Sequence, residues 1–258
     1  MTHQESFFDF AAQVGLTKHI GGIEATESLI ESCHIDKDAY VLDVGCGAGV
    51  TPCMLAKRIG CRVVGVDILE AMVKRSRERA ARAGLTDKVE FRVADAQALP
   101  FEDGLFDAVI TESVTVFPPD KQKAVMEYAR VTKPGGTVGL NESTWIKVPP
   151  PANLIEWAAK DLGTNVNPLT ADEWAGLLRS AGLKDVTANI MRVNLEEESR
   201  GLLRRYGCAG AIDVMARMLL LYFGNPAYRK FVKEVQKEGV TPPNLVEYFG
   251  YGLYTGSK

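Results

Sequence analysis

"VLDVGCGAGV", residues 41–50, places three glycines directly behind a short apolar run. The apolar run is typical of a buried strand. Glycine lets the chain turn tightly where such a strand ends, because a residue without a Cβ adopts left-handed backbone angles freely. Bare backbone also allows a ligand to approach closely. The stretch therefore predicts a strand, a tight corner and a ligand bound against that corner.

Other short runs rich in β-branched residues alternate with segments of helical period along the chain. The predicted strands are 40–45, 62–67, 89–95, 106–113, 135–142, 185–193 and 246–256. Most are apolar almost throughout, which is typical of a parallel sheet covered by helices on both faces. Gly60 and Gly84 follow two helical segments and predict their ends, and Thr170 predicts the N-cap of another.

The composition is that of an ordinary globular chain of 258 residues, with 24% charged residues and a net charge of −3. This mildly acidic balance argues against a partner bound through nucleic-acid phosphates. Five cysteines show no zinc-like spacing, so we expect no metal and a reducing compartment. The N-terminus lacks the pattern of a signal peptide, and the apolar run 218–223 is too short for a membrane span. We therefore predict a cytoplasmic protein.

The glycine pattern itself separates several nucleotide-binding motifs. Dinucleotide-binding proteins use G-x-G-x-x-G/A, whereas Val50 occupies the last small position here. A phosphate-binding P-loop would need Gly-Lys-Ser/Thr, which the chain lacks at this place. The pattern is D-x-G-x-G-x-G, starting at Asp43 within the strand.

This pattern resembles motif I of the class I S-adenosylmethionine-dependent methyltransferases. Three later stretches resemble the family's second-strand, third-to-fourth-strand and fifth-strand motifs, in the family's order: "RVVGVDILEAM" (62–72), "FRVADAQALPFEDGLFDAVITE" (91–112) and "ARVTKPGGTVGLNE" (129–142). The resemblance implies an α/β fold with a doubly wound, seven-stranded, mostly parallel sheet, an antiparallel last strand and a helical cap. It also implies S-adenosyl-L-methionine as cofactor. The overall pattern is most similar to quinone-biosynthesis C-methyltransferases.

By this resemblance, the adenosine part of the cofactor lies beyond the second and third strands. Asp67 would accept hydrogen bonds from both ribose hydroxyls, although it could instead cap the following helix. Ile68 and Met72, four residues apart on one helical face, would flank the adenine, and core packing is the alternative for Met72. Asp95 would accept from the adenine amino group, beside the backbone N–H of Ala96.

The methionine end of the cofactor would lie against the glycine corner. The residues expected there are Gly45, Cys46, Gly47 and Gly49. Asp43 would orient the corner and reach the ligand's amino group through water. Glu112 would either hold the methionine ammonium or act in catalysis.

Methyl transfer chiefly requires positioning, and a general base is needed only when the acceptor must lose a proton early. The catalytic candidates are Glu112 and His19, with a turn-fixing role as the alternative for His19. Asn141, Glu142 and Trp145 end or follow the fifth strand and are candidates for contact with the acceptor.

We expect a single domain over 1–258, with an N-terminal helical cap at 1–35, a cofactor-binding core at 36–145 and a helical insertion at 196–238. Because the sixth strand runs parallel to the first five, the insertion would lie on the ligand side as a lid. Its apolar residues suit an apolar acceptor pocket; packing into the core or against a second subunit of a homodimer is the alternative.

The predicted function is S-adenosylmethionine-dependent, in-line methyl transfer to a small molecule with an apolar part. One alternative is an arsenite or thiol-type methyltransferase, for which Cys33, Cys61 and Cys208 would have to converge. Another is a non-catalytic scaffold protein that binds the cofactor.

Overall fold

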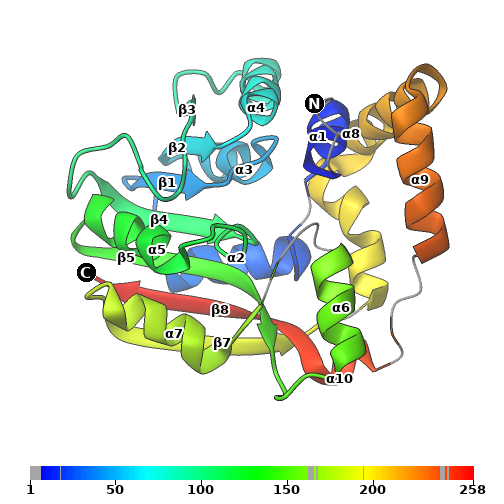
Figure 1. Cartoon of the computed structure of the whole chain (residues 1–258). Helices are drawn as coiled ribbons and strands as arrows, with labels where there is room; N and C mark the ends of the chain where they lie inside the picture. The colour runs from blue at the N-terminus through cyan, green and yellow to red at the C-terminus, as the bar shows by residue number, and fades with distance from the viewer. Residues whose placement is uncertain are drawn as a thin grey trace.

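The computed structural model describes residues 7–17, 19–161, 166, 168–193, 195–238, 242 and 244–258. Its strands form one sheet in the order β3-β2-β1-β4-β5-β8-β7, with the short β6 beside β5 (Figure 1). The strands are β1 (Tyr40–Val44), β2 (Arg62–Asp67), β3 (Val89–Val93), β4 (Phe106–Glu112), β5 (Thr132–Trp145), β6 (Leu169–Thr170), β7 (Lys184–Arg192) and β8 (Phe249–Ser257). β8 runs antiparallel to both neighbours, whereas the other pairings are parallel. The predicted doubly wound sheet with an antiparallel last strand is confirmed; β6, only two residues long, was not predicted.

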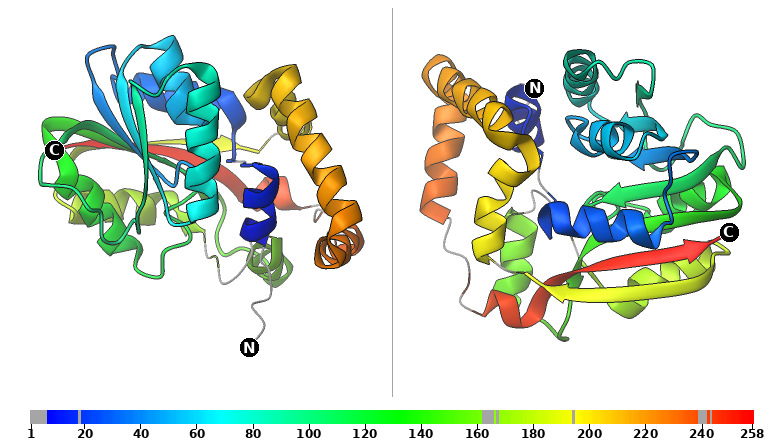
Figure 2. Two further views of the ribbon diagram at one scale, coloured as in Figure 1. Left: turned by 90° about the horizontal axis from the view of Figure 1, so that it is seen from above. Right: turned by 180° about the vertical axis from the view of Figure 1, so that it is seen from behind.

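Helices cover both faces of this sheet, as Figure 2 shows. One layer contains α2 (Gly22–Ser32), α3 (Val50–Arg58) and α4 (Glu70–Ala83), and the other contains α5 (Lys121–Val131) and α7 (Ala171–Ser180). A hydrophobic core lies on each face of the sheet. Successive side chains of β1 point to opposite faces and therefore pack into the two cores alternately. Val41 packs with the α2–α4 layer and Leu42 with the α5–α7 layer, and both are fully buried.

Local signals at the helix ends agree with the sequence. α4 is followed by Gly84 in the left-handed region (φ 65°), and Gly60, just beyond α3, also has a positive φ of 94°. Thr170 and Glu173 form a reciprocal capping box at the start of α7. Each predicted stop and cap is therefore confirmed.

The start of α4 corrects one expectation. The helix begins at Glu70 after an extended N-cap, Leu69, so Ile68 lies outside it. The cause is Asp67, whose carboxylate Oδ1 accepts the N–H of Leu69 (2.9 Å) and holds the chain in a turn before the helix. The interpretation that Ile68 and Met72 share one helical face was wrong.

Several helices lie beyond the carboxyl ends of the parallel strands. These are α1 (Phe7–Val14), α8 (Leu195–Gly224) and α9 (Pro226–Glu238), with α6 (Ala152–Asp161) and α10 (Leu245–Tyr248) near β5 and β8. α1 contacts both α4 and α8 (Figure 1), and Phe10 packs on Tyr228 of α9 with ring centroids 5.2 Å apart. α8 consists of two helical segments that meet at Gly207 (φ 66°, ψ 172°). The predicted N-terminal cap, residues 1–35, contains α1 and α2. α1 lies beyond the carboxyl ends of the strands, whereas α2 packs on one face of the sheet.

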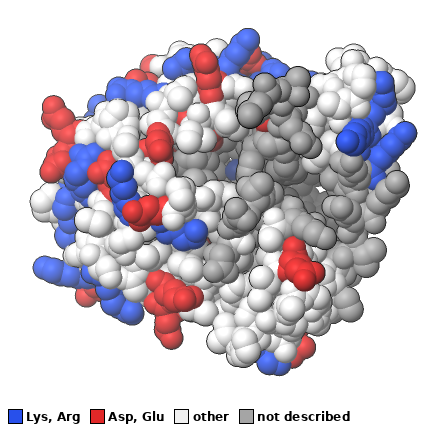
Figure 3. All heavy atoms as spheres, viewed as in Figure 1, with Lys and Arg blue, Asp and Glu red and all other residues white. Residues whose placement is uncertain are grey.

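Within the described residues, no helix is long and apolar enough to cross a membrane. On the face shown in Figure 3, acidic and basic side chains are intermixed over the sheet domain, and several Lys and Arg side chains gather over α9.

Candidate cofactor and acceptor site

The glycine corner joins β1 to α3 and needs its glycines for two reasons. Gly45, Gly47 and Gly49 all have positive φ angles (73°, 52° and 74°), which favour a residue without a side chain. A Cβ on Gly45 would also lie 2.2 Å from Val114, and one on Gly47 would lie 2.3 Å from Thr17. The corner is thus bare backbone at the carboxyl end of β1, where ligands bind in open α/β sheets.

Asp67 ends β2 directly beside this corner. Its Oδ2 accepts the N–H of Gly47 (2.9 Å), while Oδ1 accepts that of Leu69. Burial raises the pKa of the Asp67 carboxyl, and these N–H donors lower it in part. Since the N-cap of α4 is Leu69, the capping alternative for Asp67 was wrong. Each carboxylate oxygen keeps a second lone pair, so the group can still accept from a ligand diol.

The residues expected around the adenine lie in different environments. Asp95 accepts the N–H of Gln97 (2.8 Å) in the turn after β3, and Ala96 beside it is buried. Ile68 is 66% exposed and offers an open apolar surface at the end of β2. Met72 is buried against alanines of α1 and the corner, which is the core-packing alternative.

Asp43 and Cys46 are also buried at the corner. Burial raises the pKa of the Asp43 carboxyl well above its usual range, the negative charge of Glu112 raises it further, and the charge of Arg205 lowers it. Burial likewise raises the pKa of the Cys46 thiol. Burial therefore favours the uncharged forms of both groups at the floor of the corner.

Glu112 ends β4 inside a polar cluster that the sequence did not predict. Oε1 accepts from the hydroxyl of Thr51 (2.8 Å) and Oε2 from that of Thr26 (2.6 Å). His19 Nε2 lies 3.3 Å from the same Oε2. Burial acts to raise the pKa of Glu112, but the charges of His19 and Arg205 and the two hydroxyls outweigh it and leave the pKa below its ordinary value.

The two residues predicted separately as catalytic candidates thus contact each other. The second ring nitrogen of His19, Nδ1, lies 3.3 Å from the carbonyl oxygen of Ile20. Asn141 donates to that same carbonyl (2.9 Å), and the N–H of Ile20 donates to Ser113 Oγ (3.2 Å). The segment around His19 is therefore attached to the ends of β4 and β5.

Glu142 lies on the opposite face of β5 from Asn141. Its Oε1 accepts the N–H groups of Val114 (3.0 Å) and Thr115 (2.6 Å), and among the described groups its Oε2 is buried without a hydrogen-bond partner. Burial raises the pKa of Glu142 to about 7, against the lowering effect of these N–H donors. Glu142 holds the loop after β4, whose Val114 packs against Gly45.

The three predicted acceptor residues are all buried. Trp145 packs edge-on against Phe249 with ring centroids 5.5 Å apart, in a cluster that also includes Leu154. Asn141 and Glu142 are fully buried as well. In this conformation the three side chains are not exposed to an acceptor.

Sequence reasoning missed the residues that lie over the corner from α4 and α8. Tyr206 Oη accepts the N–H of Thr17 (2.7 Å), and the two hydroxyls are 3.0 Å apart. Arg79 donates to the carbonyl of Ala48 (2.8 Å), and its guanidinium carbon lies 5.2 Å from the centroid of the Tyr206 ring. Thr17 and Tyr206 are 189 residues apart, so no local pattern could have predicted this contact.

The exposed face of the second α8 segment is apolar. Five large side chains are 55% to 75% exposed: Ile212, Met215, Leu219, Leu220 and Phe223. Their spacing places them on one side of the helix. Ala211 and Val214 on another side are buried. The core-packing alternative is therefore wrong for these five residues.

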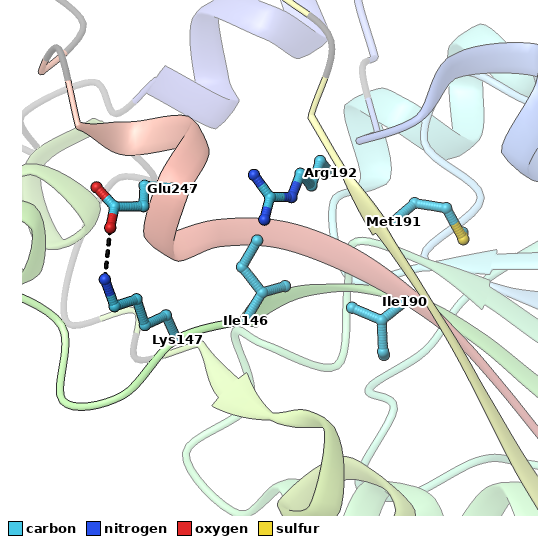
Figure 4. Close-up of a pocket in the computed structure, with 6 residues that line it drawn as sticks. All are labelled: Ile146, Lys147, Ile190, Met191, Arg192 and Glu247. Atoms are coloured by element: carbon cyan, nitrogen blue, oxygen red, sulfur yellow. Dashed lines mark hydrogen bonds and ion pairs between the residues drawn. The ribbon is translucent and has the colours of Figure 1, made fainter.

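A separate hollow of about 410 Å³ lies between β7, α10 and the segment after β5 (Figure 4). It is lined by Ile146, Lys147, Ile190, Met191, Arg192 and Glu247, with Lys147 and Glu247 paired at one side. None of the predicted cofactor residues lines this hollow.

The described cysteine side chains are buried free thiols. Burial raises the pKa of Cys33 to about 12 and that of Cys53 to about 11, and it raises the pKa of Cys61 as well. Such thiols remain protonated at neutral pH and are poor nucleophiles. The side chain of Cys208 lies outside the described residues. Within the described part of the chain, no group of three or more His, Cys, Asp or Glu could hold a metal ion.

Comparisons with known proteins find a matching family and several relatives. The family described as "Methyltransferase domain" matches residues 41–136. An uncharacterized protein of Haemophilus influenzae is 35% identical over 218 residues, which cover 83% of this chain and 86% of that protein. The 27-O-demethylrifamycin SV methyltransferase of Amycolatopsis mediterranei is 35% identical over 151 residues, covering 57% of this chain and 55% of the relative.

Solved structures share the whole fold. The [4+2]-cyclase SpnF superposes with a TM-score of 0.72 at 19% identity, over 97% of this chain and 93% of that one. Phosphoethanolamine N-methyltransferase 2 of Haemonchus contortus, bound to S-adenosylhomocysteine, gives 0.72 at 18% identity, over 97% of this chain and 56% of that one. At these identities the likeness shows the fold alone.

The chain has a doubly wound sheet with a glycine corner after β1 and an acidic residue that ends β2, and a solved methyltransferase shares its fold. Together with the sequence relatives, this shows that the chain belongs to the class I S-adenosylmethionine-dependent methyltransferases. As a member of this family it is a methyltransferase that uses S-adenosyl-L-methionine as cofactor.

Proposed function

We propose that the methyl acceptor is a small molecule with an apolar part, which binds beside the second segment of α8. The observation that carries this proposal is the exposed apolar face formed by Ile212, Met215, Leu219, Leu220 and Phe223. Contiguous exposed apolar faces often mark a site for a ligand or a partner. The helix lies at the carboxyl edge of the sheet, on the side of the cofactor, so a ligand is the simpler occupant.

The names of relatives leave the acceptor atom open. They include an O-methyltransferase for tocopherol and an N-methyltransferase for phosphoethanolamine, both from Arabidopsis thaliana. The proposal of an apolar acceptor therefore rests on α8.

When bound, S-adenosylmethionine supplies a methyl group on a sulfonium sulfur, which leaves as a neutral thioether. The residues proposed to hold the adenosine part are Asp67, Ile68, Asp95 and Ala96, and the glycine corner would hold the methionine end. Their main contribution would be alignment of the acceptor with the methyl group, an effect that can supply roughly 7–11 kcal/mol.

For Glu112 and His19 the contacts favour a positioning role. Both carboxylate oxygens of Glu112 and both ring nitrogens of His19 have polar neighbours within the protein. To take a proton from an acceptor, this pair would first have to separate. We propose that it holds the segment before α2 over the methyl group and excludes water there.

A labelling experiment tests the acceptor class. The protein is incubated with methyl-labelled S-adenosylmethionine and a cell extract, and products are partitioned between an organic and an aqueous phase. We expect label in the organic phase; label confined to the aqueous phase would contradict the proposal.

Two variants make the experiment specific. Leu220→Glu places a charge on the exposed face of α8 and should reduce transfer without changing the affinity for S-adenosylhomocysteine. Ile155→Glu, at an exposed apolar residue of α6, is the matched control and should leave transfer unchanged. If this face instead binds a second subunit, Leu220→Glu will change the sedimentation of the protein.

A further inference from the structure

Arg205 lies in the first segment of α8, two residues before the bend at Gly207. Its Nε is buried and, among the described groups, has no hydrogen-bond partner. A buried donor without a partner is costly and calls for an explanation, of which a bound ligand is one. The guanidinium lies close enough to Asp43 and Glu112 for its charge to lower the pKa of both carboxyls.

The adjacent residue fixes this part of α8 over the corner. Tyr206 is hydrogen-bonded to Thr17. Thr17 in turn lies against Gly47 of the corner, since a Cβ on Gly47 would lie 2.3 Å from it. Arg205 is therefore held near the corner, where its charge acts on Asp43 in β1 and on Glu112 at the end of β4.

The charge of Glu112 at this end favours a cation beside it. The methionine moiety of S-adenosylmethionine carries an ammonium and a carboxylate, and the Glu112 carboxylate, whose pKa lies below its ordinary value, attracts the first but repels the second. Of the described cationic groups around the corner, Arg79 already donates to Ala48 and stacks on Tyr206. His19 is paired with Glu112. Arg205 differs from both in having a buried donor, Nε, with no hydrogen-bond partner among the described groups.

We propose that Arg205 binds the α-carboxylate of the cofactor's methionine moiety. The helical insertion then completes the cofactor site, in addition to covering the acceptor. A guanidinium suits this role because its planar donors match a carboxylate in a two-point contact. The proposal rests on S-adenosylmethionine as cofactor and is independent of the acceptor.

Two ligands separate recognition of the carboxylate from general support of the site. S-adenosylhomocysteine contains the amino-acid end, whereas 5′-methylthioadenosine has the same adenosine and thioether but lacks that end. In calorimetric titrations, Arg205→Gln should lower the affinity for S-adenosylhomocysteine by about 10- to 100-fold, because a charged hydrogen-bonded contact is lost. The affinity for 5′-methylthioadenosine should stay within about twofold of the parent.

Control variants exclude charge and folding effects. Arg82→Gln removes the same charge from an exposed residue of α4 and should change neither affinity. Arg205→Lys keeps the charge and should recover part of the loss. Equal weakening of both ligands by Arg205→Gln would overturn the proposal, since Arg205 would then only support the fold. Unchanged binding of S-adenosylhomocysteine with a raised KM for the acceptor would also overturn it and assign Arg205 to the acceptor.

Discussion

Replacing Glu142 by Gln should make the protein more stable at alkaline pH, and much less so at acidic pH. Glu142 is fully buried, and burial raises its pKa from 4.5 to about 7. The folded state then binds more protons than the unfolded state between these two pH values. Stability contributed by this group is therefore present below about pH 4.5 and is lost as the pH rises through 7.

The size of the effect follows from the shift in pKa. A shift from 4.5 to about 7 corresponds to about 3 kcal/mol between the two ends of this range. The introduced glutamine amide would mimic the protonated acid, because its oxygen can still accept the N–H groups of Val114 and Thr115. We expect the variant to be more stable than the parent by about 1 kcal/mol at pH 5 and by about 3 kcal/mol at pH 8.

Urea unfolding of both proteins, followed by circular dichroism between pH 5 and pH 8, measures this difference. The contributions of Asp43 and Asp67 cancel, since both proteins contain them. Glu156→Gln, the same change at an exposed residue of α6, is the matched control. A flat difference for Glu142→Gln, or a less stable variant at pH 8, would refute the reasoning about burial.

Three further substitutions test the corner itself. Asp67→Ala should lower the affinity for S-adenosylhomocysteine by roughly 10- to 150-fold in calorimetry, because a charge-assisted contact to the ribose is lost; a loss below threefold in a folded protein would remove Asp67 from the site. Gly47→Val should abolish cofactor binding, since its φ is 52° and its Cβ would lie 2.3 Å from Thr17; a variant that binds normally in calorimetry would contradict this geometry. Tyr206→Phe removes the hydroxyl that accepts from Thr17 and should speed hydrogen exchange of the Thr17 amide; exchange at the parent rate would show that this bond does not hold the segment.

Most of the sheet and the glycine corner could be predicted because their signals are local. Apolar β-branched runs mark the strands, and the pattern of glycines marks positive φ angles at Gly45, Gly47 and Gly49. The start of α4 could not be placed, because it depends on a hydrogen bond from Leu69 to a carboxylate that also serves the corner.

The predicted acceptor residues show a signal that sequence reasoning could have used. Asn141 and Glu142 are neighbours in one strand, and neighbouring side chains of a strand point to opposite faces. They could not both face the same pocket. In the structure, Asn141 supports the segment near His19, and Glu142 supports the loop after β4.

The remaining part of the site is formed by contacts between residues far apart in the sequence, and it depends on α8. The helix has two segments that meet at Gly207 and differ in chemistry. The first carries Arg205 and Tyr206 against the corner, and the second carries the exposed apolar face that includes Leu220. If the proposals for both segments hold, one helix contacts cofactor and acceptor. Because Arg205 would contact the cofactor and Gly207 joins its segment to the second, cofactor binding would also orient the second segment, and the acceptor would bind most tightly to the protein that already holds its cofactor.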